Sequence, residues 1–98
     1  MKLTIRARNM SLHRHPFVAV GYDRAALKLR KKLEEVTRIE SEGGDPGQTI
    51  ELTIDWPTPD YPPQHLVWKA PPEHSLVWEL QSFNLDDRPM LMKPGMFA

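Results

Sequence analysis

The histidines are the side chains of this sequence best suited to bind a metal ion or to move a proton. His13 and His15 flank Arg14 in a His-x-His pattern, which places both rings on the same side of an extended segment. His65 and His74 occupy equivalent positions in two copies of a short repeat. Neutral imidazoles bind zinc or copper. A histidine base beside an arginine anion clamp could also cleave RNA by acid–base catalysis.

No other motif strengthens either interpretation. The chain has no cysteine, so thiol catalysis and thiolate zinc sites are excluded. It lacks His-Glu-x-x-His, EF-hand and Gly-x-Ser-x-Gly patterns, and no Lys-Ser/Thr follows Gly43-Gly44 to make a phosphate-binding loop. We therefore predict a protein that is not an enzyme and has neither a metal site nor a cofactor. A small His-dependent hydrolase using His13 and His15 is the second alternative.

The charges are divided unevenly along the chain, although they sum to zero. Residues 1–38 contain ten Lys and Arg against three Asp and Glu, and residues 39–98 contain three against ten. The two parts either neutralise each other in the folded protein or form surfaces of opposite sign. The second interpretation predicts a basic face for an acidic partner or a nucleic acid. Its helix residues are Arg24, Lys28, Lys31 and Lys32, and a nucleic acid would also contact Arg6, Arg8 and Arg14.

A proline-rich loop is another candidate contact surface. The segment 57–64 contains four prolines and includes the run Tyr61-Pro62-Pro63. Rigid prolines beside an aromatic ring reduce the entropy that is lost when a partner docks. The same prolines could instead turn corners and cap the edge of a sheet. The sequence favours neither interpretation, and we retain Tyr61, Pro62 and Pro63 as predicted partner contacts.

The C-terminal tail, residues 84–98, is the last candidate. It contains three of the five methionines, and Met92 and Phe97 are its predicted partner contacts. Methionine adapts its shape readily and suits contact surfaces. Because an exposed apolar tail favours aggregation, we expect this one to dock on its own domain or on a partner. A second copy of the chain is one such partner, which would make the protein a homodimer.

The apolar pattern predicts strands and one long helix. Alternation indicates strands at residues 2–8 and 48–56, and a short apolar run indicates another at 17–20. Asp23 is a typical N-cap, and apolar side chains recur every three or four residues from Tyr22 to Val36. We therefore expect a helix from Arg24 to about Ser41. The pair Gly43-Gly44 would stop it.

A tandem repeat predicts two further strands. Pro62-Pro63-Gln64-His65-Leu66-Val67-Trp68 is followed by Pro71-Pro72-Glu73-His74-Ser75-Leu76-Val77-Trp78, which carries Ser75 as an insertion. Double prolines end regular structure, and Leu-Val-Trp favours a strand. We expect strands at residues 65–69 and 75–83. Their phase directs Leu66, Trp68, Leu76 and Trp78 towards the core, together with Trp56.

These elements predict an α+β fold. One amphipathic helix would pack on an antiparallel sheet of four to five strands, in the order β-β-α-β-β-β, over residues 1–83. Strands 48–56, 65–69 and 75–83 would form a meander, because sequential strands usually pair. The positions of the first two strands stay open. Met10 and Leu12 of the connection between them are candidates for the core.

Length and composition limit the class of protein. A chain of 98 residues forms one small domain, and the absence of cysteine fits a reducing cytoplasm. The charged first residues differ from a signal peptide, and no apolar run is long enough to span a membrane. We expect a cytoplasmic, non-catalytic module that binds another protein, as adaptors, inhibitors and accessory proteins of phages and mobile elements do. The alternative is nucleic-acid binding through the basic face.

Overall fold

Two antiparallel sheets face each other in the structure, a computed structural model that describes residues 1–30, 32–56, 62–88 and 92–98. The strands are β1 (Lys2–Asn9), β2 (His15–Asp23), β3 (Glu35–Gly44), β4 (Thr49–Asp55), β5 (Leu66–Lys69), β6 (Trp78–Leu85) and β7 (Gly95–Met96). One short helix, α1 (Arg24–Lys28), and two 3₁₀ turns, η1 (Pro63–His65) and η2 (Pro72–His74), complete the described elements.

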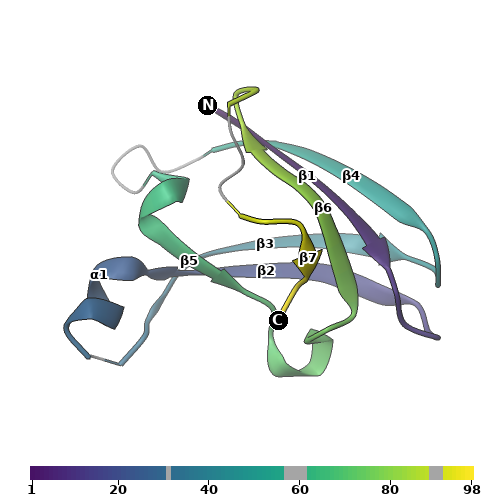
Figure 1. The fold of residues 1–98 in the computed structure, drawn as a ribbon, viewed down its shortest axis with the longest axis horizontal. Coiled ribbons are helices and arrows are strands. Elements are labelled where there is room, and N and C mark those ends of the chain that lie inside the picture. The colour runs from purple at the N-terminus through teal and green to yellow at the C-terminus, as the bar shows by residue number, and fades with distance from the viewer. Residues whose placement is uncertain (31, 57–61, 89–91) are drawn as a thin grey trace.

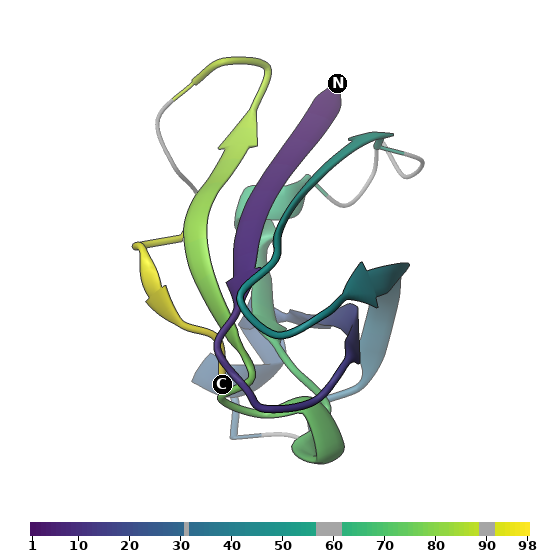
Figure 2. The ribbon, with the colours of Figure 1, turned by 90° about the vertical axis from the view of Figure 1, so that its right-hand side faces the viewer.

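The strand order is β4-β1-β6-β7 in the larger sheet and β3-β2-β5 in the smaller sheet. In Figure 1, β2 and β3 run side by side across the view, and β1, β4 and β6 arch over them. Figure 2 shows β4, β1, β6 and β7 following one another from right to left. The fold is therefore a small β-sandwich.

The predicted α+β fold is wrong, because only residues 24–28 of the predicted helix 24–41 are helical and residues 35–41 belong to a strand. α1 ends at Lys28, and β3 begins at Glu35. Residues 36, 37 and 39 are β-branched (Val, Thr and Ile), which restricts their rotamers in a helix and suits a pleated sheet. Ile39 lies opposite Ala19 of β2 and is 6% exposed, whereas Leu29 of the expected helix stripe is 65% exposed.

The predicted meander is also wrong. β1 pairs with β4 and β6, and β2 pairs with β3 and β5, so β4, β5 and β6 each pair with a strand from the first part of the chain and not with one another. Tight hairpins need loops of only a few residues. The connections around η1 and η2 are longer and contain prolines, and each carries the chain from one sheet to the other. Consecutive strands from β4 to β6 therefore do not pair.

The core fills the space between the sheets. Trp56, Trp68 and Trp78 are all buried there, as their phase predicted. The ring of Trp68 lies 5.8 Å from that of Trp56 and 5.4 Å from that of Phe83, measured between centroids. Aromatic rings bury large apolar areas and contact one another favourably at these distances. These rings join residues of β5 and β6 and the end of β4 in one cluster.

The two copies of the repeat form equivalent turns. η1 and η2 each begin at the second proline of a copy. His65 donates its backbone N–H to the carbonyl of Pro62, and His74 donates to the carbonyl of Pro71, both at 2.9 Å. The fixed φ of proline favours this local conformation. The repeat is therefore a repeated corner between sheets.

After these turns the two copies differ. In the second copy, Ser75 is inserted before Leu76, and β6 begins only at Trp78. Leu76 adopts a positive φ of 60°. Leu76 is 60% exposed, so the prediction that it faces the core is wrong. Met10 and Leu12 are likewise 50% and 88% exposed and do not enter the core.

Residues 92–98 of the tail lie against β6. Met96 of β7 pairs with Glu79 of β6, and the N–H of Phe97 donates to the carbonyl of Trp78 at 2.8 Å. Phe97 is 3% exposed, and its ring stacks on Phe17 of β2 with centroids 5.8 Å apart. This tail therefore contributes both to the larger sheet and to the core of its own chain.

Candidate functional site

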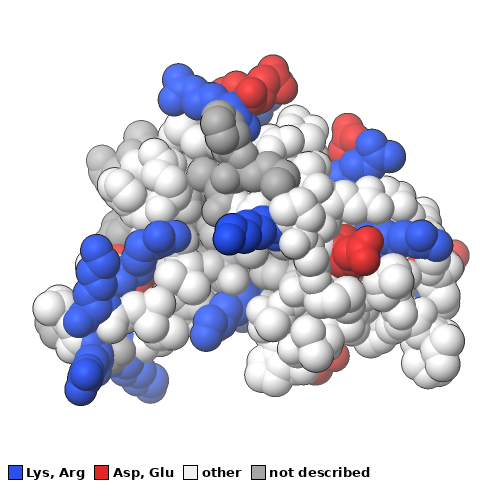
Figure 3. Space-filling view, viewed as in Figure 1, with Lys and Arg blue, Asp and Glu red and all other residues white. Residues whose placement is uncertain are grey.

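The predicted helix cations lie on α1 and the segment that follows it. Arg24, Lys28 and Lys32 are exposed, and so is Arg30, which the sequence interpretation did not single out; we call these four residues the basic lobe. Lys31 lies outside the described residues. Within the described chain, no ion pair involves the basic lobe. On the face drawn in Figure 3, blue side chains gather at the lower left, over α1.

The predicted cations of β1 have acidic neighbours instead. Arg6 lies opposite Glu51 of β4, and Arg8 lies opposite Glu79 of β6. Opposite charges at such cross-strand positions stabilise a sheet. The uneven charge of the sequence thus becomes neighbouring opposite charges on the outer face of the larger sheet. The cations of the basic lobe, by contrast, have no acidic residue opposite them on a neighbouring strand of the described chain.

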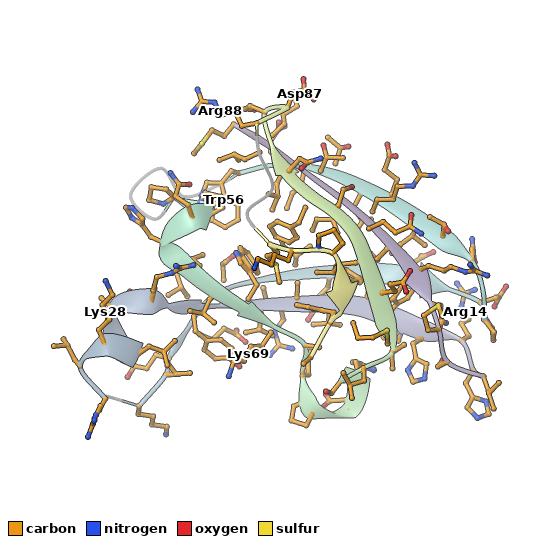
Figure 4. All side chains as sticks on the ribbon, in the orientation of Figure 1. Arg14, Lys28, Trp56, Lys69, Asp87 and Arg88 are labelled. Carbon is orange, nitrogen blue, oxygen red and sulfur yellow. The ribbon has the colours of Figure 1, made fainter. Side chains whose placement is uncertain are left out.

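Arg14 does not extend the basic lobe. Its Nη1 lies 3.1 Å from Oδ1 of Asp45 in an exposed ion pair. Figure 4 shows Arg14 and Lys28 at opposite ends of the molecule. The cations predicted for nucleic-acid contact therefore do not form one surface. Arg8 and Arg14 contact Gly47 and Asp45 respectively, whereas the basic lobe lies over α1 at the other end of the molecule.

The predicted proline and tail contacts lie mainly inside the chain. Pro63 is buried, and its carbonyl accepts a hydrogen bond from Nε1 of Trp68 at 3.3 Å. Pro62 and Met92 are partly buried, and Phe97 is buried. Tyr61 lies outside the described residues. Pro63 and Phe97 thus serve the core, and they have little surface to offer a partner.

Sequence reasoning missed an open side of the sandwich. β3 and β4 are the outer strands of their sheets and are joined by the short corner 45–48. Beyond this corner, no backbone hydrogen bond joins β3 to β4 in the described chain. At the end of β5, by contrast, the N–H of Ala70 donates to the carbonyl of Ala98 at 3.0 Å and links that strand to the tail. One side of the sandwich therefore presents two unpaired edges.

A groove of about 390 Å³ lies between these edges, lined by residues 41–43 of β3 and 48–52 of the corner and β4. We call it the edge groove. Ile50 and Leu52 pack against the core but are only half-buried, so they offer apolar surface to the groove. Glu42 and Glu51 are exposed and line it from opposite strands. The groove thus combines apolar surface with carboxylates on both walls.

The register shows which backbone groups of β4 are unpaired. The N–H of Trp56 donates to the carbonyl of Met1, and the N–H of Asn9 donates to the carbonyl of Gln48. Met1–Trp56 and Asn9–Gln48 are therefore hydrogen-bonded pairs that continue the β1–β4 ladder. Such pairs alternate with non-bonded pairs in antiparallel sheets. The residues of β4 that bond to β1 are therefore Ile50, Leu52 and Ile54. Those whose N–H and C=O groups point to the free edge are Thr49, Glu51, Thr53 and Asp55.

The cation of β3 is already engaged. Nη2 of Arg38 lies 2.7 Å from Oε1 of Glu35, and its Nη1 lies 3.5 Å from Oε1 of Glu40. The hydrogen bond with Glu35 is the main reason that the pKa of the Arg38 guanidinium is raised. Arg38 therefore pairs with carboxylates of its own strand. Of the two groove carboxylates, Glu51 lies opposite Arg6 of β1, and Glu42 has no ion pair within the described residues.

The predicted pair His13 and His15 is not in contact in the described structure. His13 is exposed, and no hydrogen bond or ring contact joins its side chain to His15 or Arg14 within the described residues. His15 instead meets His74, with the two Nδ1 atoms 3.4 Å apart. No cluster of three or more His, Cys, Asp or Glu that could hold a metal ion occurs in the described part of the chain.

Among the described residues, no helix is long and apolar enough to cross a lipid bilayer. Comparison with known proteins found no matching family model, no matching curated protein and no matching solved structure.

Proposed function

We propose that this chain is a small protein-binding module that takes up an extended, basic peptide segment as an additional strand on β4. The observation that carries the proposal is the unpaired edge of β4 beside the acidic edge groove. Exposed sheet edges bind extended peptides through main-chain hydrogen bonds, and adjacent pockets select the side chains. Thr49, Glu51 and Thr53 supply the donors and acceptors for such a ladder.

The chemistry of the groove specifies the peptide. Side chains of an added strand would point alternately into the sandwich and away from it. The inward set would contact Ile50 and Leu52, which favours apolar residues. The outward set would lie beside Glu51, which favours Lys or Arg. The preferred ligand is therefore an extended segment in which apolar and basic residues alternate.

A second copy of the chain is a poorer ligand for this edge. β4 reads Thr-Ile-Glu-Leu-Thr-Ile-Asp and contains none of the Lys or Pro residues that commonly prevent pairing between edges. Pairing of two β4 strands would, however, bring acidic strands together, since both carry Glu51 and Asp55 and neither carries a cation. A basic partner removes this repulsion, which is why we favour a different protein.

Amide exchange measured by NMR tests the proposal directly. Without ligand, the amides of Ile50, Leu52 and Ile54 should exchange slowly, and those of Glu51 and Thr53 rapidly. A short peptide of alternating Val and Lys should slow exchange at Glu51 and Thr53, because their N–H groups become hydrogen-bonded. A peptide of alternating Val and Glu is the matched control and should leave these amides unprotected.

Two substitutions make the test specific. Glu51→Lys should weaken binding of the Val/Lys peptide about tenfold at low salt, since it reverses a charge beside the ligand. Glu73→Lys is the matched control, because Glu73 is an exposed carboxylate on η2, outside the groove. Thr53→Pro removes one edge N–H and should also weaken binding. Equal affinities for all variants, or peptide-induced shifts confined to the basic lobe, contradict the proposal.

The basic lobe supports a second candidate, the binding of a nucleic acid or an acidic protein. Its cations have no acidic partner in the described chain, and Leu27 and Leu29 are 46% and 65% exposed beside them. The three tryptophans are buried, so this lobe lacks a Trp on which bases could stack. A salt-dependent gel shift that Lys28→Glu together with Lys32→Glu abolishes would support a nucleic acid. No shift at low salt would exclude it.

A further inference from the structure

We infer that His15 and His74 together bind a tetrahedral zinc ion through their Nδ1 atoms. The two residues are separated by 59 positions in the chain, yet their Nδ1 atoms lie 3.4 Å apart. The rings are nearly perpendicular, at 83°, with centroids 5.6 Å apart. Both side chains are partly buried, and neither ring has another hydrogen bond among the described residues. This pair is independent of the edge groove.

The spacing of the nitrogens fits a tetrahedral ion. Two histidine nitrogens that each lie about 2.0–2.1 Å from zinc in tetrahedral geometry are separated by about 3.3–3.4 Å. Adjacent ligands at a right angle, as in square-planar copper, would lie only about 2.9 Å apart. As a direct hydrogen bond, 3.4 Å is longer than the usual N–H contact of about 2.9–3.0 Å.

The fold holds both histidines in place before any ion binds. His15 begins β2 and lies in register with Gly44 of β3. Beside it, the carbonyl of Pro16 accepts a hydrogen bond from Nε1 of the buried Trp78 at 3.0 Å. His74 ends η2, where its own N–H donates to the carbonyl of Pro71 at 2.9 Å. Ligands on such fixed backbone lose little entropy when they bind a metal.

No third His, Asp or Glu joins the pair within the described residues, so water would complete a tetrahedral ion. Two protein ligands with open positions indicate an exchangeable ion, in contrast to the four-ligand sites that hold structural zinc. Arg14 is the cation next to His15 in sequence, and its pairing with Asp45 lowers its repulsion of a divalent ion.

Metal titration of the full chain tests the site. Zinc chloride should raise the unfolding temperature in a concentration-dependent way, because the ion binds the folded state. Cobalt(II) should give the intense visible absorption of a tetrahedral complex at one equivalent. His74→Gln and His15→Gln should each weaken zinc binding about tenfold or more, since each removes one of two ligands. Circular dichroism of both variants shows whether they are folded.

The repeat supplies a matched control. His65 occupies the same position in the first copy of the repeat, is exposed and has no contact with another histidine in the described chain. His65→Gln and His13→Gln should therefore leave zinc affinity and the cobalt spectrum unchanged. The inference is overturned if zinc produces no stabilisation, if His74→Gln binds as tightly as the unmodified chain, or if cobalt gives only the weak spectrum of an octahedral complex.

Discussion

Asn9 donates a side-chain N–H to the carbonyl oxygen of Gly44 at 2.9 Å, and this bond ties the end of β1 to the end of β3. Asn9 is fully buried. Its second Nδ2 proton goes to the carbonyl of His13, and its Oδ1 accepts from both the N–H and the hydroxyl of Ser11. One carboxamide thus satisfies four groups where the chain crosses between the sheets.

Replacing Asn9 should destabilise the fold strongly. Asn9→Ala leaves the Gly44 carbonyl without this donor in a buried place, and we expect the free energy of unfolding to fall by about 2–4 kcal/mol. Ser11→Ala removes only the hydroxyl from the same network and should cost about 1 kcal/mol. Urea denaturation of both variants measures the difference. Similar losses for the two variants would show that the carboxamide is not the centre of the network.

Gly43 and Gly47 form a second matched pair. Both have a positive φ, 71° and 78°, so alanine should cost about 1 kcal/mol at either position through backbone strain alone. A Cβ at Gly43 would also lie 1.9 Å from the backbone oxygen of His15, whereas a Cβ at Gly47 would lie 4.0 Å from Nη2 of Arg8. Gly43→Ala should therefore destabilise by about 3 kcal/mol or more. Equal denaturation midpoints for the two variants would contradict this geometry.

Ile39 and Leu29 distinguish the observed strand from the helix that the sequence pattern predicts. Ile39 is 6% exposed in the core, and Ile39→Ala should lower the free energy of unfolding by about 2–4 kcal/mol. Leu29 is 65% exposed, so Leu29→Ala should change it by less than about 0.5 kcal/mol. Chemical denaturation measures both. The reverse order of effects would favour the long helix over β3.

Phe97 and Met96 test the role of the tail. Phe97 is 3% exposed and stacks on Phe17, so Phe97→Ala should destabilise the monomer by about 3–5 kcal/mol. Met96 is 44% exposed, and Met96→Ala should cost less than about 1 kcal/mol. Light scattering at matched concentrations separates loss of stability from loss of a dimer. A Phe97→Ala variant with unchanged stability and a halved mass would instead place this ring at a subunit interface.

Strands β1, β2, β4, β5 and β6 and the inward phase of the tryptophans could be predicted, because alternation and short apolar runs are local properties. Ile50, Leu52 and Ile54 alternate with polar residues, and β4 has these residues packed against the core. The helix prediction failed because the spacing from Tyr22 to Val36 also fits a helix face. The β-branched residues 36, 37 and 39 in the same segment favour a strand instead. Pairing with β2, which places Ile39 opposite Ala19, stabilises this strand.

Local sequence patterns determined the proline corners and the inward phase of the tryptophans, but not the conformation of residues 35–41. The double prolines imposed equivalent corners at η1 and η2, and alternation placed Trp56, Trp68 and Trp78 in the core. Which strands pair depends on the tertiary structure, because each corner carries the chain from one sheet to the other. That choice left the edge of β4 unpaired and brought His15 to His74 across 59 residues. Neither relationship follows from local spacing, since each depends on contacts between distant segments.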